Sequence, residues 1–581
     1  MHVGDQLVDR LISYGVTRIF GCPGGQTLPL YSGIAHRPGE IEHVLMHDER
    51  SGAMAADAYA RYTGMIGVCD ATVGPGASNL VSGLVEAYTS SSPVLAIVPD
   101  IPRAWEHRRA FGSASQAFEQ RKFLEGTVKY YGRVQTPADL AEMLQICIHI
   151  ATSGRPGPVV LEIPDDVFES EAVEATFAAD PAVARYPRMR TAPSTTAVDE
   201  ALALLSSHER PMIVVGGGAL TAHAEPEVTE LVELLNSPIA TSLTGKGIIP
   251  ETHPLCVGVI GRFGVPMANA SMEDADCVIF IGTKTGQGTT LNWTLPFLDV
   301  PVVHIDADPF EVGRNYHNTT AVVSDAKLGV AALVAALREK PVTTTWDHEK
   351  ITKMRDAWWD GPIAYKQEPV PGVLKPQDVV RVMRKHMTDE DLFASDASLS
   401  SGWIGGRWQV RKVGRRLVEP RGLASLGWGL PAAIGIAEAF GAPESADGGR
   451  APRVVCLSGD GGWGYSLTEV ETAKRRGLSL ICVVINNSTL GWIKHSAQNR
   501  YPDGVVSQDF TDVSYADAAK ALGAETAFVD TLDDLDAALA KAFADPAKRP
   551  WVIEARSCAI ETPVLPSRTA PTQPVGPRGG Y

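Results

Sequence analysis

The residues best placed to do chemistry follow two apolar runs in the last third of the chain. Gly459-Asp460-Gly461 follows the run 454–457, and Asn486-Asn487 follows the run 480–485. Both runs predict buried parallel strands, whose carboxyl ends meet at one edge of a sheet. A carboxylate and a carboxamide at that edge, beside backbone amides exposed by glycine, suit a hard divalent cation that bridges a diphosphate. The alternative is an ordinary turn in which Asp460 caps the following helix.

Glu49 is a second candidate, because it follows a predicted strand, 43–46, and begins an alanine-rich helix that runs to Arg61. Small residues along such a helix allow a neighbouring element to approach it closely. Taken alone, a glutamate at the amino end of a helix is most simply explained as compensation of the helix dipole. The segments on either side of Glu49 favour a different role.

Three segments in the N-terminal third occur in a characteristic order. A glycine-rich segment that ends at Gly25 comes first, Glu49 follows, and Thr72–Asn79 comes third. With the Gly-Asp-Gly element, this order resembles the thiamine-diphosphate enzymes of the acetolactate synthase-like group, which includes benzoylformate decarboxylase and pyruvate oxidase. The resemblance covers nearly the whole chain and is strongest in its first and last thirds.

The resemblance implies that the chain binds thiamine diphosphate and Mg²⁺. Asp460, the side chain of Asn487 and the backbone carbonyl of Thr489 would be the metal ligands. Leu426 would lie beneath the cofactor as an apolar wedge that bends it; the alternative is a plain core leucine. The other cofactor contacts that the resemblance implies are Glu49, Pro75, Asn79, Ser400, Gly459, Gly461, Gly462, Trp463, Leu490, Gly491 and Trp492.

Four residues carry the catalytic roles that the resemblance implies. Glu49 would exchange a proton with the aminopyrimidine ring of the cofactor, and an apolar pocket would favour sharing of that proton. Gly25 would approach the substrate, while Gln116 and His495 would orient the reacting groups and move protons. The alternatives are a loop glutamine for Gln116 and an ordinary surface histidine for His495.

The positions that bind substrate depart from the family pattern. Lys284 stands where the acetolactate synthases use an arginine to recognise the substrate carboxylate, and a lysine cannot bind a carboxylate through a planar fork. Ser496 replaces a tryptophan, Trp492 replaces a methionine, and Leu399-Ser400-Ser401 replaces Gln-His-Gln. The segment around Lys284 also helps to hold flavin in those enzymes, so FAD stays an open alternative. We expect the cofactor machinery to be retained and the substrate machinery to be altered.

Strand-like runs alternate with helical patterns along all 581 residues, which predicts α/β domains with mainly parallel sheets. We expect a pyrimidine-binding domain at 1–168, a central Rossmann-like domain at 195–338, a diphosphate-binding domain at 372–562 and a Pro/Gly-rich tail at 563–581. The tail is expected either to act as a lid or to be unattached. The strand candidates include 18–20, 43–46, 67–71, 94–98, 159–163, 212–215, 277–281, 302–305, 454–457 and 480–485.

Composition excludes several classes of partner. The net charge of −16 argues against a nucleic-acid partner. No apolar run approaches the roughly 20 residues that cross a bilayer, and the N-terminus does not resemble a secretory signal. The eight cysteines are scattered without a Cys-x-x-Cys pair, which predicts reduced thiols in a cytoplasmic protein.

The expected reaction is decarboxylation of a 2-oxo acid followed by carboligation, on small-molecule substrates. The alternatives with the same cofactor are a 2-hydroxyacyl-CoA lyase or decarboxylase, a diketone hydrolase and a flavin-linked oxo acid oxidase. A catalytically silent subunit that retains the fold is the alternative outside the enzymes. The resemblance implies a homodimer or homotetramer in which Glu49 of one subunit faces the Gly-Asp-Gly element of another.

Overall fold

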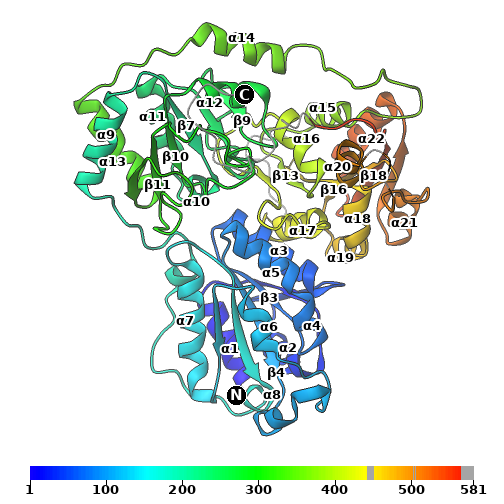
Figure 1. Ribbon diagram of the computed structural model, residues 1–581. Coiled ribbons are helices and arrows are strands. Elements are labelled where there is room, and N and C mark those ends of the chain that lie inside the picture. Colours follow the sequence, from blue (N-terminus) through cyan, green and yellow to red (C-terminus); the bar gives the residue numbers. More distant parts are fainter. Residues whose placement is uncertain (441–450, 502, 504–505, 564–581) are drawn as a thin grey trace.

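Apolar runs of the chain form three six-stranded parallel sheets in the computed structural model, which describes residues 1–440, 451–501, 503 and 506–563 (Figure 1). Every residue of β4 (Val94–Asp100) and β7 (Pro211–Val215) is buried, so these strands are covered on both faces, as parallel strands are in α/β domains. The predicted fold class of three α/β domains is therefore confirmed, whereas the exact domain boundaries stay a prediction. Apart from Pro563, the predicted tail lies outside the described residues.

The N-terminal domain contains the first sheet, in the strand order β2-β1-β3-β4-β6-β5. Its other strands are β1 (Arg18–Gly21), β2 (Glu42–Leu45), β3 (Gly67–Asp70), β5 (Tyr130–Arg133) and β6 (Val159–Pro164). Its helices are α1 (Val3–Ser13), α2 (Leu28–Ala35), α3 (Glu49–Thr63), α4 (Pro75–Asn79), α5 (Val81–Ser90), α6 (Gln120–Glu125), α7 (Leu140–Thr152) and α8 (Asp165–Phe168).

The central domain contains the second sheet, in the order β12-β11-β10-β7-β8-β9. Its other strands are β8 (Ile239–Thr241), β9 (Cys256–Val259), β10 (Cys277–Ile281), β11 (Val302–Asp306) and β12 (Thr319–Val323). Its helices are α9 (Thr195–Ser206), α10 (Gly217–Thr221), α11 (Glu225–Leu235), α12 (Pro266–Asp274) and α13 (Ala326–Glu339), and α14 (His348–Trp359) follows in the connection to the next domain.

The C-terminal domain contains the third sheet, in the order β14-β13-β15-β16-β18-β17. Its strands are β13 (Leu392–Ser395), β14 (Leu417–Val418), β15 (Val454–Gly459), β16 (Leu480–Asn486), β17 (Glu525–Val529) and β18 (Trp551–Arg556). Its helices are α15 (Pro376–His386), α16 (Leu399–Arg407), α17 (Gly429–Phe440), α18 (Asp460–Ser466), α19 (Glu469–Arg475), α20 (Gly491–Arg500), α21 (Tyr515–Ala521) and α22 (Leu532–Ala544).

The first and third sheets have the same strand order, in which the chain moves to the other side of the first strand before it forms the third. Loops at the carboxyl ends of those two strands separate at this point and leave a crevice where ligands bind in open α/β sheets. In the C-terminal domain the crevice lies between β13 and β15, and Asp460 begins α18 directly after β15. The fold thus places the Gly-Asp-Gly element where a ligand site is expected.

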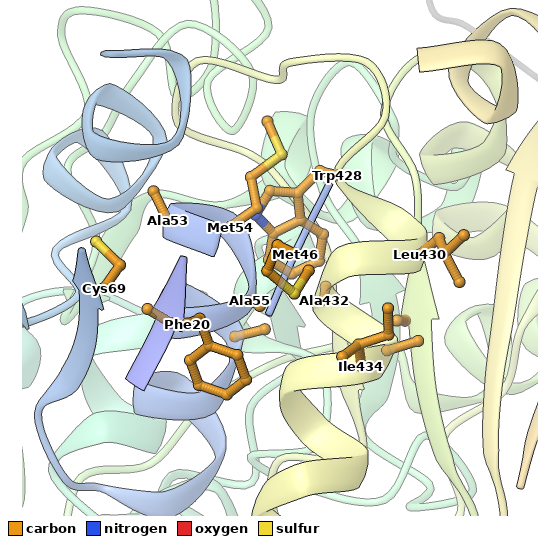
Figure 2. Packing of buried hydrophobic residues seen from close by; sticks show 14 of the residues in the cluster. Phe20, Met46, Ala53, Met54, Ala55, Cys69, Trp428, Leu430, Ala432 and Ile434 are labelled. Carbon is orange, nitrogen blue, oxygen red and sulfur yellow. The ribbon is translucent and has the colours of Figure 1, made fainter. Parts of the chain in front are cut away.

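Helices α3 and α17 join the N-terminal and C-terminal domains in one apolar cluster. Figure 2 shows Met54 and Ala55 of α3 beside Trp428, which directly precedes α17, and all three are buried. The two helices approach closely, because a Cβ atom added to residue 435, a glycine, would lie 2.2 Å from the Ala55 carbonyl oxygen. The small residues of α3 therefore allow α17 to approach closely, as the alanine-rich pattern predicted.

Two further expectations bear on the class of protein. Within the described ranges, none of the helices has both the length and the apolar character to span a membrane. All eight cysteines are free thiols, and six of them are buried.

Candidate active site

Asp460 and Asn487 converge at the edge between β15 and β16. The Asp460 Oδ2 atom accepts hydrogen bonds from the backbone N–H groups of Asn487 and Thr489, both at 3.2 Å. The Thr489 N–H group also lies 3.2 Å from the Asn487 Oδ1 atom, so the carboxylate and the carboxamide oxygens flank the same donor. Burial raises the pKa of the Asp460 carboxyl to about 6, against the lowering effect of the backbone hydrogen bonds. A bound cation would favour the ionised carboxylate.

The residues around this pair fit a magnesium diphosphate. Hard oxygen ligands of mixed type suit Mg²⁺, which keeps positions for phosphate and water oxygens. Beside them the edge is open: a Cβ atom added at Gly459 would meet only the Ser400 Oγ atom, at 3.8 Å. Ser400 lies in the first turn of α16, where the backbone amides have no partner within the helix and can bind an anion. Gly459 and Ser400 thus leave space for a phosphate and offer donors to it.

The other predicted contacts in the C-terminal domain surround the same edge. A Cβ atom added at Gly461 would lie 2.7 Å from the Leu490 side chain, and one added at Gly491 would lie 2.8 Å from the Leu399 side chain. Gly462 and Trp463 follow in α18, and the Trp463 side chain is fully buried in the cluster between the domains. The Trp463 side chain is therefore not available to a phosphate.

Asp396 is a buried carboxylate that the sequence reasoning missed. It follows β13, and its oxygens accept hydrogen bonds from the N–H groups of Gly427 (3.1 Å) and Gly429 (3.3 Å) and from the Ser458 hydroxyl (2.9 Å). It therefore ties the end of β15 to the loop that carries Leu426. The signal was available, because Asp396 follows an apolar run just as Asp460 does.

Glu49 occupies the first turn of α3 and faces its own domain. Asp48 caps the helix by accepting the Arg50 N–H group at 2.7 Å. The Asn79 amide donates to the Glu49 Oε2 atom at 3.0 Å, and a Cβ atom added at Gly76 would lie 3.0 Å from Oε1. Asn79 ends the short helix α4, which Pro75 begins. The segment Thr72–Asn79 thus contacts the carboxylate of Glu49.

The residues next to Glu49 reach the C-terminal domain of the same chain. The Arg50 guanidinium donates to the Tyr465 carbonyl at 3.0 Å and lies 5.4 Å from the Tyr465 ring centroid. Tyr465 is five residues beyond Asp460 on α18, which is about 7.5 Å along a helix axis. Among the described residues of one chain, however, no hydrogen bond or ion pair joins Glu49 itself to Asp460 or Asn487.

A buried carboxylate of the N-terminal domain holds the loop that leads to Leu426. The Glu86 oxygens accept the N–H groups of Gly422, Leu423 and Ala424 at 3.0, 2.9 and 2.8 Å. Leu426 itself stays partly exposed, unlike the buried core leucines, so its side chain is available to a ligand. Sequence reasoning missed Glu86, because no spacing relates it to a loop more than 300 residues away.

The remaining predicted catalytic residues lie in different settings. Gly25 adjoins open space, because an added Cβ atom would meet nothing within 4 Å. The Gln116 side chain is exposed, whereas the buried Gln120 accepts the Gly74 N–H group at 3.4 Å and donates to the Pro99 carbonyl at 3.1 Å. Gln120 is thus the glutamine that supports the segment Thr72–Asn79, and the sequence reasoning did not single it out.

His495 lies on α20 beside Lys366, Lys494 and the segment 559–561. Burial, followed by the charges of the two lysines, lowers its pKa. Its Nε2 atom is buried without a hydrogen-bond partner among the described residues. Among the described residues, no hydrogen bond or ion pair joins His495 to Glu49 or Asp460, and its proposed role in proton transfer stays untested.

Aromatic and cationic side chains connect the central domain to the loop that carries Asn487. The Trp492 ring stacks on Phe263 with 5.5 Å between centroids, and the Arg262 guanidinium lies 4.9 Å from the Trp492 centroid. Because Trp492 follows Gly491 at the start of α20, this contact joins the central domain to the loop that carries Asn487.

A cavity of about 660 Å³ lies between the three domains. The glycine turns 216–218 and 282–288 of the central domain form part of its wall. Its cationic lining residues are Arg61, Arg155, Arg262, Lys284, Arg415 and Arg421. Lys284, the residue in place of the family's carboxylate-binding arginine, donates to the Thr89 carbonyl, and burial lowers its pKa to about 8. Lys284 thus makes a contact between domains.

Glu419, two residues before the cavity-lining Arg421, is a buried carboxylate whose oxygens have no hydrogen-bond partner among the described residues. Burial raises its pKa from 4.5 to about 7, although the nearby charges of Arg421 and Lys246 oppose that rise. The folded state therefore binds a proton that the unfolded state releases, and stability is lost as the pH rises from about 4.5 through 7.

Glu419→Gln is expected to remove this pH dependence. The free energy of unfolding of the variant, relative to the wild type, should increase by about 2.5 kcal/mol between pH 5 and pH 8. Urea unfolding at the two pH values measures it. The exposed Glu349→Gln is the control, and an equal difference at both pH values would show that Glu419 is ionised in the folded protein.

Comparison with known proteins identifies the family. Three family models for thiamine pyrophosphate enzymes match the chain. The N-terminal TPP binding domain matches residues 1–121, the central domain matches 198–333 and the C-terminal TPP binding domain matches 396–555.

Curated relatives match over most of their length. Acetolactate synthase of Arthrospira platensis is 33% identical over 522 residues, which are 87% of this chain and 85% of the relative. The acetolactate synthase large subunit of Parasynechococcus marenigrum is 30% identical over 580 residues, 98% of this chain and 90% of the relative. The chain therefore belongs to the thiamine pyrophosphate enzymes and is related to the acetolactate synthases.

Proposed function

We propose that the chain catalyses decarboxylation of a 2-oxo acid and carboligation of the remaining acyl unit to a second carbonyl compound. The observation that carries this proposal is the similarity to curated acetolactate synthases over 85–90% of their length, together with the convergent side chains of Asp460 and Asn487. When bound, thiamine diphosphate supplies a carbon nucleophile and accepts the electron pair released as a bond to the attacked carbon breaks.

In this proposal Asp460, Asn487 and the Thr489 carbonyl hold Mg²⁺, and Glu49 is the acid–base group. The Asn79 amide donates a hydrogen bond to the Glu49 Oε2 atom. Oε1 has no hydrogen bond from the described residues and lies over Gly76, so this oxygen holds and returns the proton. Leu426, whose loop is fixed by Glu86, supports the cofactor from below and excludes water.

A panel of substrates tests the reaction. The protein with thiamine diphosphate and Mg²⁺ is incubated with pyruvate and other 2-oxo acids, alone and with a second 2-oxo acid or an aldehyde. We expect release of CO2 and a carboligation product, followed by mass spectrometry. Binding of the cofactor without turnover of any substrate would instead support a catalytically silent subunit.

The cavity favours one alternative, a 2-hydroxyacyl-CoA lyase or decarboxylase. Its volume is that of a typical ligand site, and its glycine turns and cationic side chains suit the phosphates of a nucleotide. Cleavage of acyl-CoA substrates, with thermal protection by ADP, would favour this reaction. FAD is the other nucleotide that the cavity could hold, and a yellow purified protein with flavin absorbance would favour the oxidase.

The proposed enzyme works as a homodimer or homotetramer in the cytoplasm. Among the residues that the structure describes, the side chain of Glu49 forms its hydrogen bond within its own domain, with Asn79, and Asn79 is exposed in a single chain. This supports an arrangement in which a second subunit completes each site.

A further inference from the structure

Two arginines of the cavity are held by an aromatic stack. The Arg421 guanidinium lies 4.4 Å from the centroid of Phe263, and the Arg262 guanidinium lies 4.9 Å from that of Trp492. Phe263 and Trp492 stack on each other, with an angle of 30° between their planes. The stack restricts both side chains, so little conformational freedom would be lost when they bind a ligand.

Neither arginine forms an ion pair within the described part of the chain, although the carboxylates of Glu419 and Glu86 act on Arg421 from a longer distance. No carboxylate lies within 4.0 Å of either guanidinium, and the one side-chain hydrogen bond of the pair runs from Arg421 Nε to the Pro420 carbonyl, at 2.7 Å. Two other cations of the cavity are paired with carboxylates, whereas Lys284 and Arg415 donate only to carbonyl or hydroxyl oxygens among the described residues. Arg61 pairs with Asp57 at 2.6 Å and Arg155 with Glu311 at 2.8 Å.

This lack of partners has an energetic consequence. Both arginines are partly buried, and burial lowers the pKa of each. A partly desolvated cation without a carboxylate in direct contact is costly, and an anion that enters the cavity would offset that cost. The planar guanidinium matches a carboxylate in shape as well as in charge.

The pair lies beside both segments that flank the proposed cofactor site. Arg421 directly precedes the loop 422–424, which Glu86 clamps and which leads to Leu426. Arg262 contacts Trp492, which follows Leu490 and Gly491. An anion bound by the pair would therefore lie next to the reacting groups.

We infer that Arg262 and Arg421 form a subsite for the carboxylate of the acceptor substrate, an inference that rests on the proposed carboligation. The donor loses its carboxylate as CO2, so a strong ionic contact with that group would stabilise the ground state and oppose the reaction. The carboxylate of an acceptor 2-oxo acid keeps its charge throughout. The two arginines therefore select an anionic acceptor over a neutral aldehyde. They take the carboxylate-binding role for which Lys284, bonded to the Thr89 carbonyl, is not used.

The test compares acceptors in the holoenzyme and in the variants Arg421→Gln and Arg262→Gln. Each variant is expected to raise the KM for a 2-oxo acid acceptor by about 10- to 100-fold, the usual effect of losing a charged hydrogen bond. The KM for an aldehyde acceptor and the rate of CO2 release from the donor should stay within about twofold. Arg155→Gln, which changes a paired cation of the same cavity, is the control.

Equal losses with both acceptors, or none, would overturn the inference. Calorimetry with propionate and its uncharged amide separates this outcome from failure of the proposed function, because binding needs no turnover. Propionate should bind to the wild-type protein with cofactor, but not to either variant, and the amide should not bind. If ADP rather than propionate binds and the variants lose it, the arginines serve a nucleotide phosphate and the acceptor subsite is refuted.

Discussion

Glu49→Gln is expected to lower kcat by about 10²- to 10⁴-fold, the contribution that one acid–base side chain usually makes. Glutamine has the size of glutamate and can still accept the hydrogen bond from Asn79, but it cannot hold and return a proton. The fold should be retained, because the substitution removes only a favourable charge at the start of α3, worth about 0.3–1 kcal/mol. Steady-state kinetics with saturating cofactor measure the loss.

The matched control is Glu349→Gln, which changes another first-turn glutamate on the exposed helix α14. It should leave kcat unchanged. Calorimetry should show that the Glu49 variant still binds thiamine diphosphate with Mg²⁺, because Asp460 and Asn487 are intact. A Glu49 variant that binds the cofactor and turns over at the wild-type rate would mean that Glu49 only stabilises its helix.

The buried strands were predictable because a parallel strand covered on both faces is a continuous apolar run. Runs such as 277–281 and 480–485 coincide with β10 and β16 to within one residue. The edge strands gave a weaker signal. β17 is half exposed and β14 has two residues, so neither forms an apolar run that stands out from its neighbours.

The candidate site was predictable where chemistry follows directly from the end of a strand. Asp460 and Asn487 follow adjacent strands, so sequence position alone brings them together. Glu86 and Arg421 differ, because their roles depend on how separate domains pack. The carboxylate of Glu86 meets amides more than 300 residues away, and the partner of Arg421 is an aromatic ring of another domain. No local pattern encodes such contacts.

Co-expression of a Glu49→Gln chain with an Asp460→Ala chain is expected to restore about a quarter of the wild-type activity, although each variant alone is inactive. Enzymes of this family typically form dimers, and in a twofold dimer each site would take Glu49 from one subunit and Asp460 from the other. A mixed dimer then contains one site with both residues intact and one with neither. Random pairing makes half of the dimers mixed, which sets the expected recovery.

The structure of one chain gives this prediction its physical basis. Within the described part of the chain, the Glu49 carboxylate is hydrogen-bonded in its own domain, by Asn79, whereas the neighbouring Arg50 contacts α18 of the same chain. The Oε1 atom is therefore left for a cofactor whose metal ligands belong to a second subunit. Activity of the unseparated mixture measures the recovery, and mixed dimers isolated through two different affinity tags should show about half of the wild-type activity. If the isolated mixed dimers stay inactive while each chain binds its partner, Glu49 and Asp460 must act within the same chain.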